Sequence, residues 1–247
     1  VCKPRGELVL ASGDDGIHAD ATLDISGGSL TITKSYEGIE SAVITINDGN
    51  IHVIASDDGV NIVGGVDGSG MGGRPGQGTF NYTGNNYLYI NGGYLAVNSG
   101  GDGLDVNGAI EMTGGVVLVN GPTANMNGAL DHMGFKMTGG LLVAAGSSGM
   151  AMGASTTSTQ YSVMMNFSSA VTAGTIIRLQ TESGEDIVTF APAKVFQSVV
   201  VCSPELKKGA TYAVYGGGSS TGTATDGLYS GGTYSGGNQL TTFTISS

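Results

Sequence analysis

The sequence contains no tryptophan and only nine lysines and arginines, against twenty aspartates and glutamates. The net charge of −11 argues against nucleic acid as a partner, because phosphate binding needs a basic surface. Without tryptophan, the residues alone give no support for a flat cellulose-binding platform. A run of about 18 apolar residues is also missing, so we expect no membrane span.

Cysteine and proline are rare as well. Cys2 and Cys202 are the only cysteines, so at most one disulfide exists, and the sequence leaves open whether the two thiols pair. Five prolines contrast with 45 glycines, which follow no collagen period. Because valine, isoleucine and leucine are well represented, this composition favours short strands joined by glycine turns over a disordered chain.

An acidic glycine turn recurs in the first half of the chain. It reads SGDDGIHA at 12–19, SYEGIESA at 35–42, ASDDGVN at 55–61 and SGGDGLDV at 99–106. Two short segments of alternating apolar and polar residues follow each turn and are separated by a second glycine turn, a pattern typical of strands. The units are about 21–22 residues long: equivalent apolar residues (Ile17, Ile39, Val60, Leu104 and Leu130) are 22, 21, 44 and 26 residues apart, and the step of 44 contains one coil plus a glycine-rich insertion at about 62–86.

Repeats of this size bury a hydrophobic face only by stacking, which predicts an all-β fold: a right-handed parallel β-helix. We expect coils over residues 1–154 and a C-terminal antiparallel β cap over 155–247, where the period disappears. Two inward columns are predicted: Leu23, Ile44, Leu88, Ile110 and Phe135, then Leu30, Ile51, Leu95, Val117 and Leu142. The outward column becomes apolar in later coils, so we expect the cap to cover it there: Thr31, His52, Ala96, Leu118 and Val143.

Stacking also aligns the acidic turns into a ladder. One column contains Asp15, Glu37, Asp58 and Asp102, and a second contains His18, Glu40, Asn61, Asp105 and Asp131. Two carboxylates about 4.8 Å apart repel by roughly 3–4 kcal/mol at an effective dielectric of 20. Calcium relieves such repulsion because it takes about 6–8 oxygen ligands in irregular geometry.

The sequence therefore predicts more than one Ca²⁺ ion shared between neighbouring coils. The predicted ligands are Asp14, Asp15, Glu37, Glu40, Asp57, Asp58, Asn61, Asp102 and Asp105. His18 fits an oxygen site poorly, which makes the first turn the weakest candidate. The alternative is a solvated acidic edge that discourages aggregation.

Several co-linear motifs carry a resemblance to a known family. They are DDGIHAD, ISGGSLTITKSYEGIES, SDDGVN, GSGMGGRPGQG, VNGPT, AAGSSGMA and TDGLYSGGTYSGG. Together they resemble the clostridial and gut-bacterial carbohydrate-binding β-helix proteins, which are similar in architecture to family 9 pectate lyases. The resemblance spans residues 6 to 245 and implies an extracellular or cell-surface β-helix with bound calcium. Its implied partners are plant cell-wall polysaccharides, both acidic (pectin-like) and cellulosic.

The same resemblance raises an enzyme alternative. The family 9 lyases surround a catalytic calcium with aspartates that include a DDxxD turn, and a lysine serves as the base. In this chain Asn61 and His18 replace the last acid of that turn, and only Asp105 keeps it. Lys34 is the lysine nearest the ladder in sequence, and a charge partner of Glu37 is its simpler role.

A binding function requires less of the sequence than catalysis does. Uronate carboxylates complete the coordination of calcium held on the coil edge, so no basic surface is needed. The candidate sugar contacts are Tyr36, Tyr89, Lys34 and Arg74. We expect a non-catalytic, calcium-dependent polysaccharide binder. The alternatives are a calcium-dependent pectate lyase with Lys34 as base, and a structural surface protein whose calcium only rigidifies the stack.

Overall fold

The computed structural model describes residues 6–63 and 85–246, which form an all-β protein. This part of the chain contains no helix, and hence no helix that could cross a membrane. Cys2 and Arg74 lie outside the described residues, as does most of the glycine-rich insertion.

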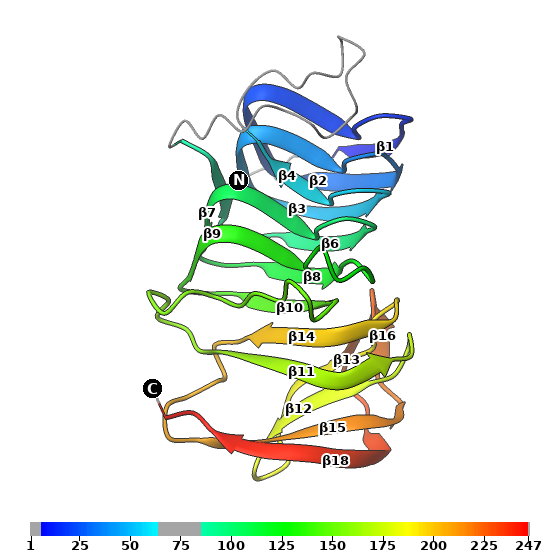
Figure 1. Cartoon of the computed structure of the whole chain (residues 1–247), viewed down its shortest axis with the longest axis vertical. Coiled ribbons are helices and arrows are strands. Elements are labelled where there is room, and N and C mark those ends of the chain that lie inside the picture. The colour runs from blue at the N-terminus through cyan, green and yellow to red at the C-terminus, as the bar shows by residue number, and fades with distance from the viewer. Residues whose placement is uncertain (1–5, 64–84, 247) are drawn as a thin grey trace.

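The first half of the chain is a β-solenoid of about five turns, each of about 22 residues, as the repeat predicted (Figure 1). Strands of successive turns pair in parallel. The solenoid strands are β1 (Glu7–Ala11), β2 (Ile17–Lys34), β3 (Ile39–Ala55), β4 (Val60–Ile62), β5 (Tyr87–Ile90), β6 (Tyr94–Ser99), β7 (Leu104–Met112), β8 (Val116–Asn120), β9 (Leu130–Met137) and β10 (Leu141–Gly146).

Both predicted inward columns are confirmed residue by residue. Ile44 pairs with Leu23 on one side and Leu88 on the other, and the register continues through Ile110 to Phe135. The second column runs in the same way from Leu30 to Leu142. Apart from Leu23 in the first coil, these side chains are buried, and they form one continuous core along the solenoid.

The first two complete coils differ in detail from the predicted pairs of short strands. β2 and β3 each run unbroken through the glycine turn at which we expected a strand to end. Gly28 and Gly49 have φ values of 87° and 127°, so the chain bends there while the strand pairing continues on both sides.

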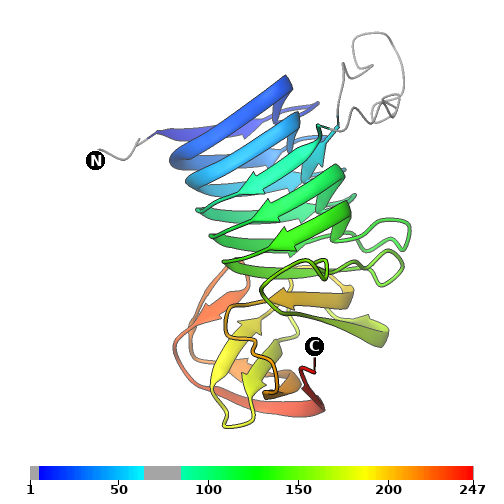
Figure 2. The same ribbon diagram turned by 90° about the vertical axis from the view of Figure 1, so that its left-hand side faces the viewer.

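The C-terminal part forms the predicted antiparallel cap (Figure 2). β14 (Phe196–Cys202) runs antiparallel along β10, and β11 (Ser162–Val171) runs antiparallel along β14. A separate six-stranded antiparallel sheet follows. Its strands are β12 (Ile177–Thr181), β13 (Asp186–Phe190), β15 (Thr211–Ser220), β16 (Thr223–Thr225), β17 (Leu228–Ser230) and β18 (Tyr234–Thr244).

The cap covers the later coils of the outward column, as predicted. Leu118 and Val143 are fully buried in a second core together with side chains of the cap. Further toward the N-terminus the contact becomes polar: the Asp226 carboxylate accepts a hydrogen bond from Tyr94 (2.7 Å) and lies 2.9 Å from His52 Nε2. The outward face therefore changes from an apolar interface to a polar one along the stack.

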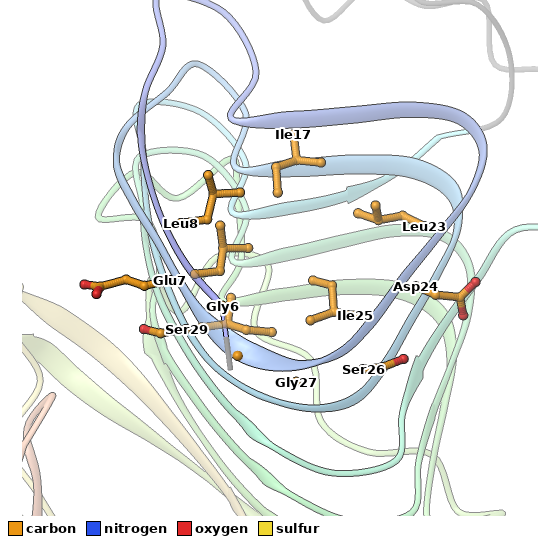
Figure 3. A pocket seen from close by; sticks show the side chains of 13 residues that line it. Gly6, Glu7, Leu8, Ile17, Leu23, Asp24, Ile25, Ser26, Gly27 and Ser29 are labelled. Atoms are coloured by element: carbon orange, nitrogen blue, oxygen red, sulfur yellow. The ribbon is translucent and has the colours of Figure 1, made fainter. Parts of the chain in front are cut away.

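The two ends of the solenoid differ. Cys202 of β14 is a buried free thiol in the solenoid core at the capped end. At the other end, β1 leaves a hollow of about 320 Å³, into which Ile17, Leu23 and Ile25 point while Asp24 points away (Figure 3). The hollow is the open core of the first coil.

Candidate metal centre

The acidic turns stack directly on one another through backbone hydrogen bonds. The amides of Gly16, Gly38 and Gly59 each donate to a carbonyl of the next coil, at 2.8–2.9 Å. These carbonyls belong to Glu37, Asp58 and Asp102, so the predicted first column is present in the structure.

Strand pairing aligns the second column equally well. His18 pairs with Glu40, Glu40 with Asn61, Asn61 with Asp105, and Asp105 with Asp131. The two columns lie three residues apart along each coil. The ladder is therefore a strip of oxygen-bearing side chains along the edge of the solenoid.

The glycine within each turn is required for space. A Cβ on Gly38 would collide with the Gly59 carbonyl and the Val53 side chain, and one on Gly59 with Val97 and the Gly103 carbonyl. Neither glycine has a positive φ. Glycine thus lets adjacent turns approach closely enough for their acids to converge.

Within the described residues, two groups of three metal-ligating side chains have ligand atoms that all lie within 4.8 Å of one another. We call them the histidine group (Asp15, His18 and Glu40) and the aspartate group (Asp58, Asp102 and Asp105). Each group draws on two adjacent coils, as the shared-ion prediction required.

Backbone amides hold the aspartate group in place. The amide of Asp102 donates to Asp58 Oδ1 at 2.6 Å, and the amide of Gly128 donates to Asp102 Oδ1 at 2.5 Å. All three carboxyl groups are half-buried. Their orientation is thus fixed by the solenoid itself.

Asn61 lies beside this group, in register with Asp105. Its amide nitrogen donates to Glu37 Oε2 at 2.5 Å, but its Oδ1 atom is buried and accepts no hydrogen bond. The side chain is 7% exposed. A buried acceptor without a donor is costly, and a cation bound beside Asp105 would satisfy it.

Burial raises the pKa of several ladder carboxyls. It raises the pKa of Glu37 to about 9, with a hydrogen bond to Glu40 as the next cause, and that of Asp102 to about 6. The pKa values of Asp58 and Asp105 are also raised, first by burial and then by neighbouring carboxylates. Without a cation, protons therefore reduce the charge of the ladder near neutral pH.

The histidine group has a different donor set. Nδ1 of His18 lies 3.4 Å from Asp15 Oδ2 and 3.6 Å from Glu40 Oε2, while Nε2 lies 3.2 Å from Asp20 Oδ1. His18 was left out of the predicted ligands because it is not an oxygen donor. The signal that could have found it was its position in the second column, directly beside Glu40.

The remaining predicted ligands fall outside the two groups. Asp14 is exposed at the surface of its turn. Asp57 forms a hydrogen bond with Tyr36, which is the main cause of the rise in the Tyr36 pKa to about 12. Glu37 binds Asn61 between the two groups.

The described predicted sugar contacts lie in two parts of the solenoid: Lys34 and Tyr36 at and just after the end of β2, and Tyr89 on β5. Lys34 is exposed at the end of β2, and the ion pairs among the described residues do not include one between Lys34 and Glu37. The Glu37 carboxyl is instead buried and accepts a hydrogen bond from Asn61. Tyr89 stacks on Tyr87, with ring centroids 5.4 Å apart and planes 10° from parallel. Arg74 lies outside the described residues.

Comparison with known proteins assigns no family. No family model, curated protein or solved structure matches the chain. The functional argument consequently rests on the geometry of the ladder.

Proposed function

We propose that the chain binds acidic polysaccharide through calcium held by the aspartate group. The observation that carries the proposal is the buried, unpartnered Oδ1 of Asn61 next to three converging carboxyls. Hydrogen bonds within the aspartate group account for the carboxyl positions, but they leave this oxygen unsatisfied.

The donor set suits calcium. Asp58, Asp102, Asp105 and Asn61 offer only oxygen atoms, which calcium prefers as a hard cation. Calcium accepts about 6–8 oxygens, so these four side chains leave coordination positions for water or a ligand carboxylate. The three carboxylates more than balance the charge of one Ca²⁺ ion. Because metal ligands must be deprotonated, calcium binding would release the protons that the raised pKa values of these carboxyls retain.

Because the chain is strongly acidic, it can bind an anionic ligand only if a cation lies between the protein carboxylates and those of the ligand. With a net charge of −11, the chain repels a uronate polymer in the absence of metal. A calcium ion with open positions supplies the bridge between protein and sugar carboxylates. The stacked rings of Tyr87 and Tyr89, on β5 of the same solenoid, offer a face for a sugar ring.

We propose binding without catalysis. Elimination from a uronate needs a base beside the metal-bound sugar. Lys34, the lysine nearest the ladder in sequence, is exposed at the end of β2 and belongs to neither group of metal-ligating side chains. Cellulose as a second ligand, and a location outside the cell, rest on the family resemblance.

The proposal is tested by titrating metal-stripped protein with calcium, with and without polygalacturonate, while ultraviolet absorbance reports any unsaturated product. We expect heat from calcium binding, polymer binding that depends on calcium, and flat absorbance. Asp102→Asn should abolish both binding events, whereas Glu185→Gln, an exposed acid of the cap, should preserve them. Polymer binding that survives chelation would refute the proposal, and rising absorbance would establish a lyase.

A further inference from the structure

We infer that the histidine group is a separate site for a first-row divalent metal, with zinc as the best fit. It consists of Asp15, His18 and Glu40, and its chemistry differs from that of the aspartate group. The inference does not depend on polysaccharide binding or on calcium.

The distances around His18 are those expected between ligands of one small cation. Nδ1 lies 3.4 Å from Asp15 Oδ2 and 3.6 Å from Glu40 Oε2, beyond the range of about 2.7–3.2 Å that N–H···O hydrogen bonds prefer. Tetrahedral zinc, with bonds of about 2.0–2.2 Å, separates its ligand atoms by roughly 3.3–3.6 Å. Two of the three donor separations therefore match those of atoms that share one tetrahedral zinc ion.

The type of donor also distinguishes zinc from calcium. Imidazole nitrogen together with carboxylate oxygen suits zinc and other first-row divalent metals, whereas calcium selects oxygen. The same turn in the aspartate group supplies Asp105 where the first turn supplies His18. One side chain thus changes the ligand chemistry of an otherwise repeated turn.

A fourth residue, outside the three ligands, orients the imidazole. Asp20 Oδ1 lies within hydrogen-bond distance of Nε2, at 3.2 Å, and the Asp20 side chain is 78% exposed. Metal-binding histidines usually donate a hydrogen bond from their second ring nitrogen to such a carboxylate, which fixes the tautomer so that the first nitrogen presents its lone pair to the metal. With Nε2 protonated, the lone pair of Nδ1 faces two carboxylates, an arrangement that a cation stabilises.

The site is anchored on one side and open on the other. Glu40 is 4% exposed and Asp15 10%, whereas His18 is 29% exposed. Three protein ligands with a solvent-facing side leave a fourth position for water or an anionic ligand, as in open zinc sites. This arrangement suits reversible binding of metal from solution.

The test is a zinc titration of the metal-stripped full chain in excess calcium, repeated with cobalt(II) as an optical probe. We expect one zinc ion per chain and the visible absorption bands of low-coordinate cobalt with one nitrogen donor. His18→Ala should lower zinc affinity by about 100-fold or more, and Asp20→Asn by about 10–100-fold, since outer partners usually have this effect. Because the Asp20 side chain is exposed, Asp20→Asn should not disturb the fold, so a loss of zinc affinity in this variant would reflect the site itself. Circular dichroism of each variant checks that it is folded.

Other outcomes would overturn the inference. If zinc does not bind, or if His18→Ala leaves zinc affinity unchanged, the group is a set of hydrogen-bonded side chains and not a metal site. If calcium displaces zinc at equal concentration, the group is a second oxygen-type site. Asp102→Asn, which should eliminate calcium binding, should leave zinc binding intact, so the two proposals fail independently.

Discussion

The histidine group and the aspartate group are two versions of one turn, placed by the same backbone hydrogen bonds. In both, a carboxylate precedes a tightly packed glycine, and a second ligand follows three residues later. They differ in that second ligand, which is His18 in one and Asp105 in the other. The comparison teaches that the solenoid repeat fixes where these side chains lie, whereas individual residues decide which donor atoms each turn presents.

Glu37 and Asn61 lie between the two groups and connect them. Glu37 belongs to the first column and is bound to Asn61, whose free oxygen lies beside Asp105. Burial raises the pKa of Glu37 to about 9, so it retains a proton at neutral pH. A neutral carboxyl between the groups reduces the electrostatic repulsion between their acidic side chains.

The largest expected effect is a selective loss of one metal. Asp102→Asn removes a charged oxygen ligand from the aspartate group, and we expect calcium affinity to fall by about 100-fold or more, because ligand charge strongly sets calcium affinity. Calorimetry of calcium binding and of zinc binding checks this. Equal loss of both metals would mean that the groups are not separate.

A large effect is also expected from pH in the absence of metal. The native state binds more protons than the unfolded state between the unfolded carboxyl pKa of about 4 and the Glu37 value of about 9, so the free energy of unfolding falls as pH rises through this window. Thermal melts in chelator from pH 5 to 9 measure the slope.

Glu37→Gln is the matched variant for this pH effect. It retains the hydrogen-bonding shape but does not titrate, so its melting temperature should depend less on pH. Calcium should also reduce the slope, because binding requires deprotonated ligands and strengthens as pH rises. An unchanged slope in Glu37→Gln would show that Glu37 is not the group responsible.

A moderate effect is expected from Asn61→Asp. The added carboxylate lies beside Asp105 and near Glu37, so the melting temperature without metal should fall by several degrees, equivalent to about 1–2 kcal/mol. Calcium should raise it by more than in the natural chain, because an extra charged ligand becomes available. Asn61→Leu, which has no oxygen ligand, should respond less to calcium than the natural chain. The same response in all three proteins would exclude Asn61 as a ligand.

The smallest effect concerns sugar contact. Tyr89→Ala breaks the stacked pair with Tyr87 and should weaken polygalacturonate binding by about 3–10-fold, equivalent to roughly 1 kcal/mol, without changing calcium affinity. Tyr229→Ala, in the cap, serves as the control. If both variants bind the polymer equally well, the tyrosine pair is not part of the contact surface.

The sequence predicted the positions of the ladder better than its chemistry. Periodicity determines register, so the columns through Ile44 and Asp58 follow from the repeat and the spacing of coils. Side-chain rotamers do not follow from periodicity: the repeat placed His18 beside Glu40, but it did not predict that the imidazole nitrogen would lie 3.6 Å from the Glu40 carboxylate. The same applies to the free oxygen of Asn61, which depends on which way its amide points.

The most direct test of the central claim is a paired titration of metal-stripped protein with calcium and zinc, carried out on the natural chain and on His18→Ala and Asp102→Asn. The account predicts that the natural chain binds both metals and that each variant loses one: zinc for His18→Ala and calcium for Asp102→Asn. Binding of neither metal by the natural chain would reduce the ladder to a protonated acidic edge and contradict the account.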